Sequence, residues 1–155
     1  MAPQRVKVSL DSNILVYAAH NDDERHEAAV AILERAARGD CVQPLQSLGE
    51  CFNVLTRKRR FAPAAAMAAV DKLRAMFPIV VADEPALESA MAAVQDHKLQ
   101  FWDALLWATV RRAGCRVLFS EDMNDGQDIA GVKIVNPLKP ENRMIVDLAL
   151  PHLDA

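Results

Sequence analysis

Residues 6–16 read VKVSLDSNILV, and this stretch indicates the fold of the chain. Residues 6–10 are rich in β-branched and apolar side chains, which predicts a short buried strand that ends at Asp11. Residues 14–19 are too apolar for a surface loop, and they predict a helix directly after the strand. A strand that leads at once into a helix is the usual beginning of a parallel α/β fold.

The same alternation continues outward along the chain. The further strands are expected at residues 41–45, 78–81, 116–120 and 133–136. The further helices are expected at residues 25–38, 47–55 (capped by Ser47), 63–76, 84–97 and 102–113. Strands that alternate with helices pair in parallel through right-handed crossovers. We therefore expect an α/β fold: a three-layer α/β/α sandwich with a central parallel sheet.

One domain and a short tail account for the whole length. The chain has 155 residues, of which 52% are hydrophobic, and this is enough for one sizeable core. We expect the domain to span residues 1–138 and the C-terminal tail to span residues 139–155. The tail carries an apolar run at 144–150, which suits packing on the domain or contact with a partner, and the sequence leaves both open.

Composition and charge exclude several classes of protein. Lys and Arg number 18 against 21 Asp and Glu, a formal net charge of −3, which argues against binding of nucleic acid by charge alone. Three widely spaced cysteines without a C-x-x-C pair are typical of a reducing compartment. Residues 1–10 carry charges where a signal peptide needs apolar side chains, and no apolar run is long enough to span a bilayer. We expect a cytoplasmic protein without membrane contact.

Four acidic residues are expected at one edge of the sheet. Asp11 and Asp122 each follow a predicted strand, while Glu50 and Asp103 lie in the first turns of predicted helices. Ligands of parallel α/β sheets bind beyond the carboxyl ends of the strands, so these carboxylates can share one cleft. Their mutual repulsion is relieved by a divalent cation, and carboxylates without His or Cys suit Mg²⁺ or Mn²⁺. The pattern indicates metal-assisted hydrolysis of a phosphodiester.

Each acid also has a purely structural explanation. Asp11 can be the polar end of a strand, Glu50 part of a capping box, and Asp122 a turn residue. Asp103 can stabilise the first turn of a helix through the helix dipole. That explanation is weakest for Asp103, because its aromatic and apolar neighbours indicate a mostly buried helix start, where an unpaired carboxylate is costly.

The order of these motifs resembles the PIN-domain nucleases, and within them the VapC-type toxins of type II toxin–antitoxin systems. The motifs are VSLDSNILVYA at 8–18, QS at 46–47 before Glu50, WDALL at 102–106 and LFSEDMNDG at 118–126. The resemblance extends over nearly the whole chain, and it rests on the set of motifs in this order.

This resemblance implies a Mg²⁺- or Mn²⁺-dependent endoribonuclease with the PIN three-layer fold. Its four acidic metal-site positions, which are also the catalytic ones, are matched by Asp11, Glu50, Asp103 and Asp122. Its supporting polar positions are matched by Asn13 and Ser120, with Asp125 as a further candidate for contact with substrate. The implied partners are an RNA substrate, a cognate antitoxin that covers the acidic cleft, and a second copy of the chain in a homodimer.

The densest basic run follows the helix that carries Glu50. It consists of Arg57, Lys58, Arg59 and Arg60. These cations either bind RNA phosphates or complement the C-terminal end of a helix dipole in solvent, and the sequence leaves both open.

Nearby residues receive no functional role from the sequence. Trp102 and Trp107 are five residues apart and do not share one helical stripe, so we expect both in the core rather than as platforms for stacking bases. Glu121 is expected to point to solvent.

Two other functions fit part of the pattern. An aspartyl-phosphate phosphotransferase also places an Asp after its first strand, but Asn13 stands where it usually has a second Asp, and Lys133 is a poor candidate for its lysine. A catalytically inactive PIN-like module that only binds protein or RNA is the main alternative. The presence of all four acids argues against it.

Overall fold

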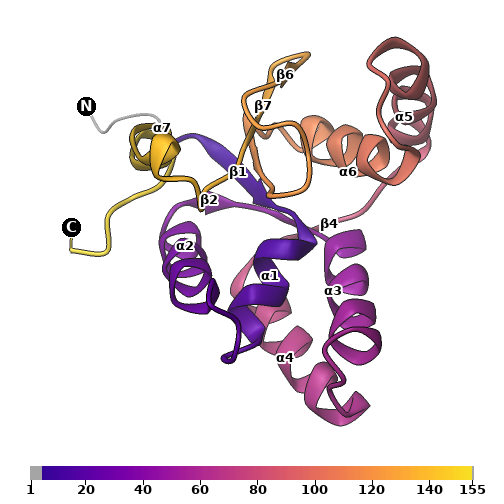
Figure 1. Cartoon of the computed structure of the whole chain (residues 1–155). Coiled ribbons are helices and arrows are strands. Elements are labelled where there is room, and N and C mark those ends of the chain that lie inside the picture. Colours follow the sequence, from indigo (N-terminus) through magenta and orange to yellow (C-terminus); the bar gives the residue numbers. More distant parts are fainter. Residues whose placement is uncertain (1–4, 155) are drawn as a thin grey trace.

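The computed structural model describes residues 5–154 (Figure 1). The strands are β1 (Lys7–Leu10), β2 (Asp40–Cys41), β3 (Gln43–Pro44), β4 (Ile79–Val80), β5 (Val117–Phe119), β6 (Asp128–Ile129) and β7 (Val132–Val135). The helices are α1 (Ser12–Ala19), α2 (His26–Arg38), α3 (Leu45–Arg57), α4 (Pro63–Met76), α5 (Glu84–Asp96), α6 (Phe101–Arg112) and α7 (Arg143–Ala149), with a 3₁₀ turn at Pro140–Asn142.

The central sheet is mainly parallel. Its strand order is β2-β1-β5-β7-β6, with parallel pairing everywhere except between β6 and β7. The antiparallel β6–β7 hairpin was not predicted, and its turn has positive φ angles at Ala130 (49°) and Gly131 (93°). The strand predicted at 41–45 divides into β2 in the central sheet and β3, which pairs with β4 in a separate parallel sheet.

Two apolar clusters cover the two faces of the central sheet, which confirms the predicted three-layer α/β architecture. Successive side chains of a strand point to opposite faces. In β5, Val117 and Phe119 belong to the cluster with α1 to α4, whereas Leu118 belongs to the cluster with α5 and α6. Figure 1 shows α1 to α4 on one side of the strands and α5 and α6 on the other.

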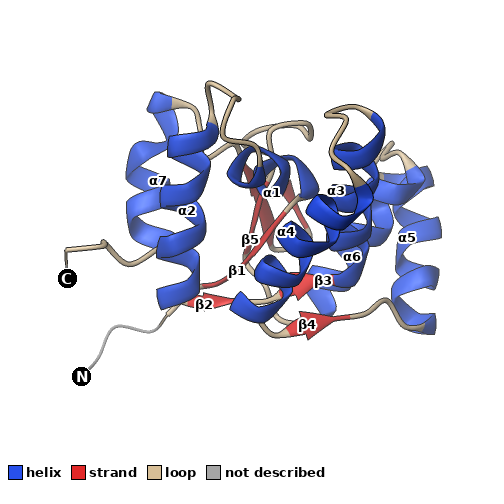
Figure 2. Cartoon of the chain, turned by 90° about the horizontal axis from the view of Figure 1, so that it is seen from below, coloured by secondary structure: helices blue, strands red, loops and turns tan. Residues whose placement is uncertain are grey.

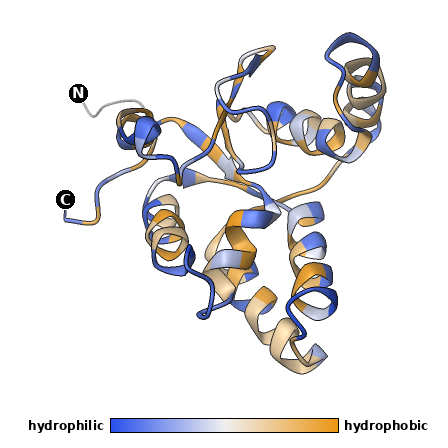
Figure 3. Ribbon diagram, in the orientation of Figure 1, coloured by the Kyte–Doolittle hydropathy of each residue, from blue (hydrophilic) through white to orange (hydrophobic). Residues whose placement is uncertain are grey.

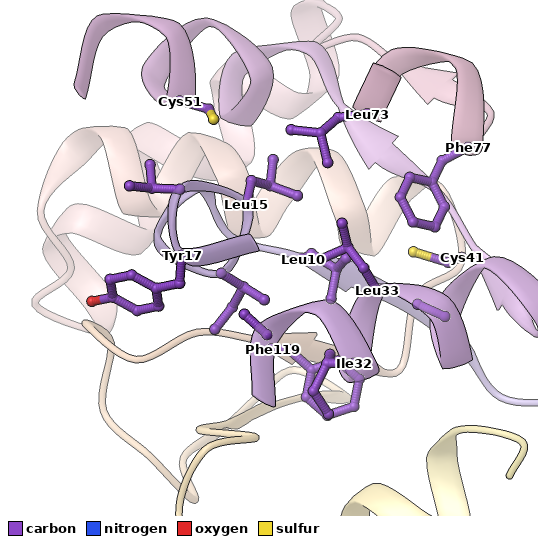
Figure 4. Close-up of a cluster of buried hydrophobic side chains, with 14 of the residues drawn as sticks. Leu10, Leu15, Tyr17, Ile32, Leu33, Cys41, Cys51, Leu73, Phe77 and Phe119 are labelled. Carbon is purple, nitrogen blue, oxygen red and sulfur yellow. The ribbon is translucent and has the colours of Figure 1, made fainter. Parts of the chain in front are cut away.

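The cluster around α1 is the larger and more continuous of the two. Figure 4 shows Leu10, Leu15 and Phe119 from β1, α1 and β5 packed with Leu33 of α2 and Leu73 of α4. The residues of α1 from Asn13 to Tyr17 are all buried, which agrees with its mainly apolar colouring in Figure 3. The apolar run that predicted α1 therefore forms the centre of this layer.

The described part of the tail carries α7, which lies beside α2 (Figure 2). Arg35 of α2 donates hydrogen bonds to Asp147 (3.0 Å), to the carbonyl of Leu150 (3.2 Å) and to the carbonyl of Pro151 (2.9 Å). Val146 and Leu150 are buried in the same cluster as α2. Among residues 5–154, no helix is both long and apolar enough to cross a membrane.

The predicted start of α3 is wrong. Helix α3 begins at Leu45, directly after Pro44, so Ser47 lies inside the helix, where its buried hydroxyl has no hydrogen-bond partner. Ser47 and Glu50 therefore do not form a capping box. In α5, the small side chains of Ala86, Ala90 and Ala93 pack against α6, and Leu87, Met91 and Val94 form an exposed face.

Candidate functional site

The structure brings the four predicted acids to one edge of the central sheet. Asp11 is the N-cap of α1 and directly follows β1, and Asp122 follows β5. The two strands are neighbours, and the backbone N–H of Asp11 donates to the carbonyl of Phe119 (2.9 Å). Glu50 and Asp103 reach this edge from α3 and α6. Their charges act on Asp11, and those of Glu50 and Asp122 act on Asp103, so the four carboxylates form one electrostatic cluster.

Asp11 is the most enclosed of the four, with an exposed fraction of 5%. Its Oδ1 accepts a hydrogen bond from the backbone N–H of Ser12 (2.7 Å), and its Oδ2 accepts one from the hydroxyl of Ser120 (2.7 Å). Burial, with smaller contributions from the charges of Glu50 and Asp103, raises its pKa to about 6 despite these hydrogen bonds. Asp103 is half-buried, and its pKa is also raised, first by burial and then by Glu50 and Asp122.

Ser120 organises the loop that follows β5. Besides donating to Asp11, its Oγ accepts the backbone N–H groups of Asp122 (3.2 Å) and Met123 (3.3 Å). Asn13 holds the same loop, because its Oδ1 accepts the backbone N–H of Glu121 (3.2 Å). Both residues thus fix the position of Asp122 relative to Asp11. The sequence predicted supporting roles for these two residues.

Gln46 belongs to the QS motif before Glu50, but the sequence assigns it no role at the site. Its Nε2 donates both to Glu50 Oε1 (2.8 Å) and to the carbonyl of Trp102 (3.0 Å). Both acceptors are oxygen atoms, so the amide orientation is determined by its hydrogen bonds. Gln46 therefore connects α3 to the start of α6. The signal that could have revealed this role is the position of a polar residue one helical turn before Glu50.

The prediction that Glu121 points to solvent is wrong. The hydroxyl of Tyr17 donates to Glu121 (2.5 Å), and Arg25 also donates to Glu121 (3.1 Å) while its guanidinium lies 3.8 Å from the centre of the Tyr17 ring. Arg25 and Arg59 both bind Asp23, and hydrogen bonding to Arg25 holds the pKa of Asp23 well below its usual range. The loop backbone, held by Asn13, directs Glu121 toward α1.

The predicted basic run divides into exposed and bonded residues. Arg57, Lys58 and Arg60 are exposed. Arg59 is less exposed, and it donates to Asp23 (2.8 Å) and lies 3.0 Å from the Nδ1 of His20. Arg59 thus has a structural partner, whereas its three neighbours remain available at the surface.

Asp125 has partners other than the four acids. Its Oδ1 accepts from the backbone N–H of Asn136 (2.8 Å) and from the amide of Asn142 (2.9 Å), and Lys139 lies 3.4 Å from its Oδ2. Two hydrogen bonds and this cation hold its pKa below the usual range. These contacts link the loop after β5 to the segment after β7.

The donor chemistry of the cluster fits a hard divalent cation. In the part of the chain that the structure describes, no three Asp, Glu, His or Cys side chains lie close enough to one another to bind the same metal ion. All four groups are nevertheless carboxylates, and burial together with their mutual repulsion raises the pKa of both Asp11 and Asp103. Oxygen donors suit Mg²⁺ and Mn²⁺, and a double positive charge removes that repulsion. The four carboxylates thus fit a divalent cation in the type of their donor atoms and in their charge.

The chain matches a model of a known protein family. The family model described as PIN domain matches residues 8–128, which include all four acids. No curated protein matches the chain.

The chain is also similar to several solved structures. A toxin–antitoxin complex from Klebsiella pneumoniae is 24% identical over 85% of this chain and 98% of that chain, with a TM-score of 0.60. Mycobacterium tuberculosis VapC20, a sarcin-ricin loop cleaving toxin, is 21% identical over 74% and 89%, with a TM-score of 0.60. DNA-bound VapBC from Salmonella typhimurium is 17% identical over 83% and 96%, with a TM-score of 0.61. These likenesses show a shared fold.

Proposed function

Because the chain belongs to the PIN domain family, we propose that it is a metal-dependent endoribonuclease, and specifically the toxin of a toxin–antitoxin pair. The observation that carries this proposal is the convergence of Asp11, Glu50, Asp103 and Asp122 at the carboxyl edge of parallel strands. Such a cluster lies where α/β folds bind ligands, and its charge calls for a cation.

The four carboxylates would hold Mg²⁺ or Mn²⁺. When bound, such an ion supplies a Lewis acid for the phosphate and lowers the pKa of water. Ser120 keeps one oxygen of Asp11 engaged and so sets the orientation of this carboxylate. One of the four carboxylates accepts the proton of the attacking water. Asn13 and Ser120 keep the loop with Asp122 in place during the reaction.

Cleavage of a mixed pool of RNA separates this function from its rivals. The purified protein should cut the RNA with Mg²⁺ or Mn²⁺ and stop when EDTA removes the metal. A phosphotransferase would take up phosphate and leave the RNA intact. An inactive module would bind RNA or a protein and cut nothing. Intact RNA with either metal would overturn the proposal.

We also propose that the partner is a small antitoxin protein that acts in the cytoplasm together with this chain. Two of the similar structures are toxin–antitoxin assemblies. The acidic cluster would attract a basic side chain, and Arg binds carboxylates in a bidentate geometry. The buried free thiols of Cys41, Cys51 and Cys115 suit a reducing cytoplasm. A reading frame upstream that suppresses the toxicity of this chain would identify the partner.

The exposed basic residues should bind RNA phosphates. Replacing Arg57 and Arg60 with Ala should weaken RNA binding and lower the slope of log affinity against log salt by about 0.7 for each phosphate that is no longer neutralised. Titrations of single-stranded RNA at several salt concentrations measure this slope. Arg116→Ala is the matched control, because Arg116 is exposed at the amino end of β5, the opposite edge of the sheet. An unchanged slope would mean that these arginines only face solvent.

We infer that a second copy of the chain packs on the exposed face of α5. Leu87, Met91 and Val94 form this face with exposed fractions of 42%, 54% and 39%. In a two-fold dimer the same apolar stripe meets itself, so both copies lose apolar surface to water. Met91→Lys should therefore shift the protein from dimer to monomer in sedimentation experiments. The control is Met144→Lys on α7, also at an exposed Met, and a wild-type monomer at high concentration would refute the inference.

A further inference from the structure

Trp102 is placed unlike a core residue. The sequence predicts both tryptophans in the core. This is correct for Trp107, which is buried and donates its indole N–H to the carbonyl of Ile129 (2.9 Å). It is wrong for Trp102, which is 56% exposed in the first turn of α6, directly before Asp103. The two tryptophans are five residues apart and lie on different stripes of α6, so only one of them faces the core. A large aromatic surface thus faces solvent beside the acidic cluster.

The position of Trp102 is held from two sides. Its ring meets Phe101 edge to face, with ring centres 5.0 Å apart and an interplanar angle of 73°. Its backbone carbonyl accepts the amide of Gln46, whose Nε2 also donates to Glu50. The backbone of Trp102 is therefore tied to Glu50 through Gln46, and the contact with Phe101 restricts the indole, which lowers the conformational entropy lost when a ligand stacks on it.

The charge around Trp102 selects the kind of ligand. Asp103 directly follows Trp102, and Gln46 joins the carbonyl of Trp102 to Glu50, so negative charge lies near it. A phosphate group is repelled there, whereas a neutral flat ring is not. Bases stack on exposed aromatic side chains whatever their sequence, and single-stranded RNA presents such unpaired bases. A second copy of the chain fits less well, because two-fold pairing through Trp102 would bring two acidic clusters together.

One face of α3 extends from Trp102 to the basic run. Gln46, Glu50, Asn53 and Arg57 recur at spacings of four, three and four residues, so they line the same side of the helix. Gln46 and Arg57 are eleven residues apart, which is about 16 Å along the helix. A short single strand can cross that distance, with Glu50 lying between the two ends.

We propose that Trp102 is the platform on which an unpaired base of the RNA substrate stacks, next to the phosphodiester that is cut. This inference rests on the proposed ribonuclease function. The stacked base and the phosphates bound near Arg57 then hold the strand on both sides of the acidic cluster. The neutral indole of Trp102 thus adds affinity for RNA beside the acidic cluster, whose negative charge opposes the binding of phosphates.

Binding of a mixed-sequence single-stranded RNA decamer tests the proposal, with EDTA present so that the RNA stays intact. Trp102→Ala should raise the Kd about five- to a hundredfold, the range expected for one lost base stack, and Trp102→Phe should recover most of the affinity. RNA should quench tryptophan emission in the wild type and not in Trp102→Phe, which keeps only the buried Trp107. Leu148→Ala, at another exposed apolar residue, is the control and should bind like the wild type.

Cleavage and sedimentation complete the test. In cleavage with Mg²⁺, Trp102→Ala should raise KM far more than it lowers kcat. If the wild type shows quenching by RNA but no cleavage, the ribonuclease function fails and the base platform stands. If the wild type cleaves and Trp102→Ala cleaves with the same KM, the platform fails and the function stands. The inference would be overturned if Trp102→Ala bound RNA as tightly as the wild type. It would also be overturned if Trp102→Ala changed dimerisation instead of RNA affinity.

Discussion

Replacement of Asp103 by Asn should abolish metal-dependent RNA cleavage while the fold stays intact. The substitution keeps the size of the side chain and removes one of the four negative charges that we propose hold the metal. Loss of a group that only supports a metal ligand already costs roughly 10–100-fold, so the loss of a ligand should lower the cleavage rate by more than about a hundredfold. Initial rates of cleavage of an RNA pool with Mg²⁺ measure this effect, and Asp11→Asn should behave in the same way.

The stability of the variant separates a lost ligand from a damaged fold. Without metal, Asp103→Asn should be at least as stable as the wild type, because the pKa of Asp103 is raised by burial and by its acidic neighbours. Mg²⁺ should raise the Tm of the wild type and raise that of the variant much less. Glu88→Gln removes an exposed carboxylate on α5 and should change neither activity nor the response to Mg²⁺. Full cleavage by Asp103→Asn would rule out the assigned site.

Phe119→Ala should cause the largest loss of stability that one side chain of the core can give. Phe119 ends β5 with no exposed surface, and it packs between the sheet and the helices on the α1 side (Figure 4). Removing a buried Phe side chain leaves a cavity and costs about 3–5 kcal/mol. For a domain of this size that lowers the Tm by roughly 10 °C. Urea unfolding and calorimetry measure the two quantities.

Two further variants serve as controls for this loss of stability. Phe119→Leu keeps most of the apolar volume and should cost much less than Ala. Leu148→Ala removes a side chain that is 78% exposed on α7 and should change the free energy of unfolding by less than about 0.5 kcal/mol. If Phe119→Ala were no more harmful than Leu148→Ala, the described packing of β5 would be incorrect.

The general architecture could be predicted because its signals are local. The apolar run of α1 and the short strand before it are visible in adjacent residues, and alternation of such segments leaves parallel pairing as the simplest topology. The convergence of the acids also follows, since Asp11 and Asp122 come after neighbouring parallel strands. The β6–β7 hairpin was missed because its strands are short and its turn depends on two residues with positive φ.

Several features that the sequence does not predict concern which neighbour a side chain meets. Helical spacing places Leu87, Met91 and Val94 on one face of α5, but the direction of that face depends on how closely the alanines let α6 approach. Trp102 and Trp107 lie on different stripes of the same helix, and their spacing alone does not tell which stripe faces the core. Glu121 meets Tyr17 and Arg25 across more than 90 residues, which no local pattern reveals.

The pairing of β1 with β5 also determines when the acidic cluster can form during synthesis of the chain. The hydrogen bond between Asp11 and Ser120 joins residues that are 109 positions apart. At about 5–20 residues per second, a ribosome needs roughly 5–20 s to travel from one to the other. Until then β1 lacks its β5 partner, and Asp122 has not yet been made. An unfinished chain therefore carries an incomplete acidic cluster, and under the proposed function the ribosome that makes it would not meet the complete metal site before synthesis is nearly finished.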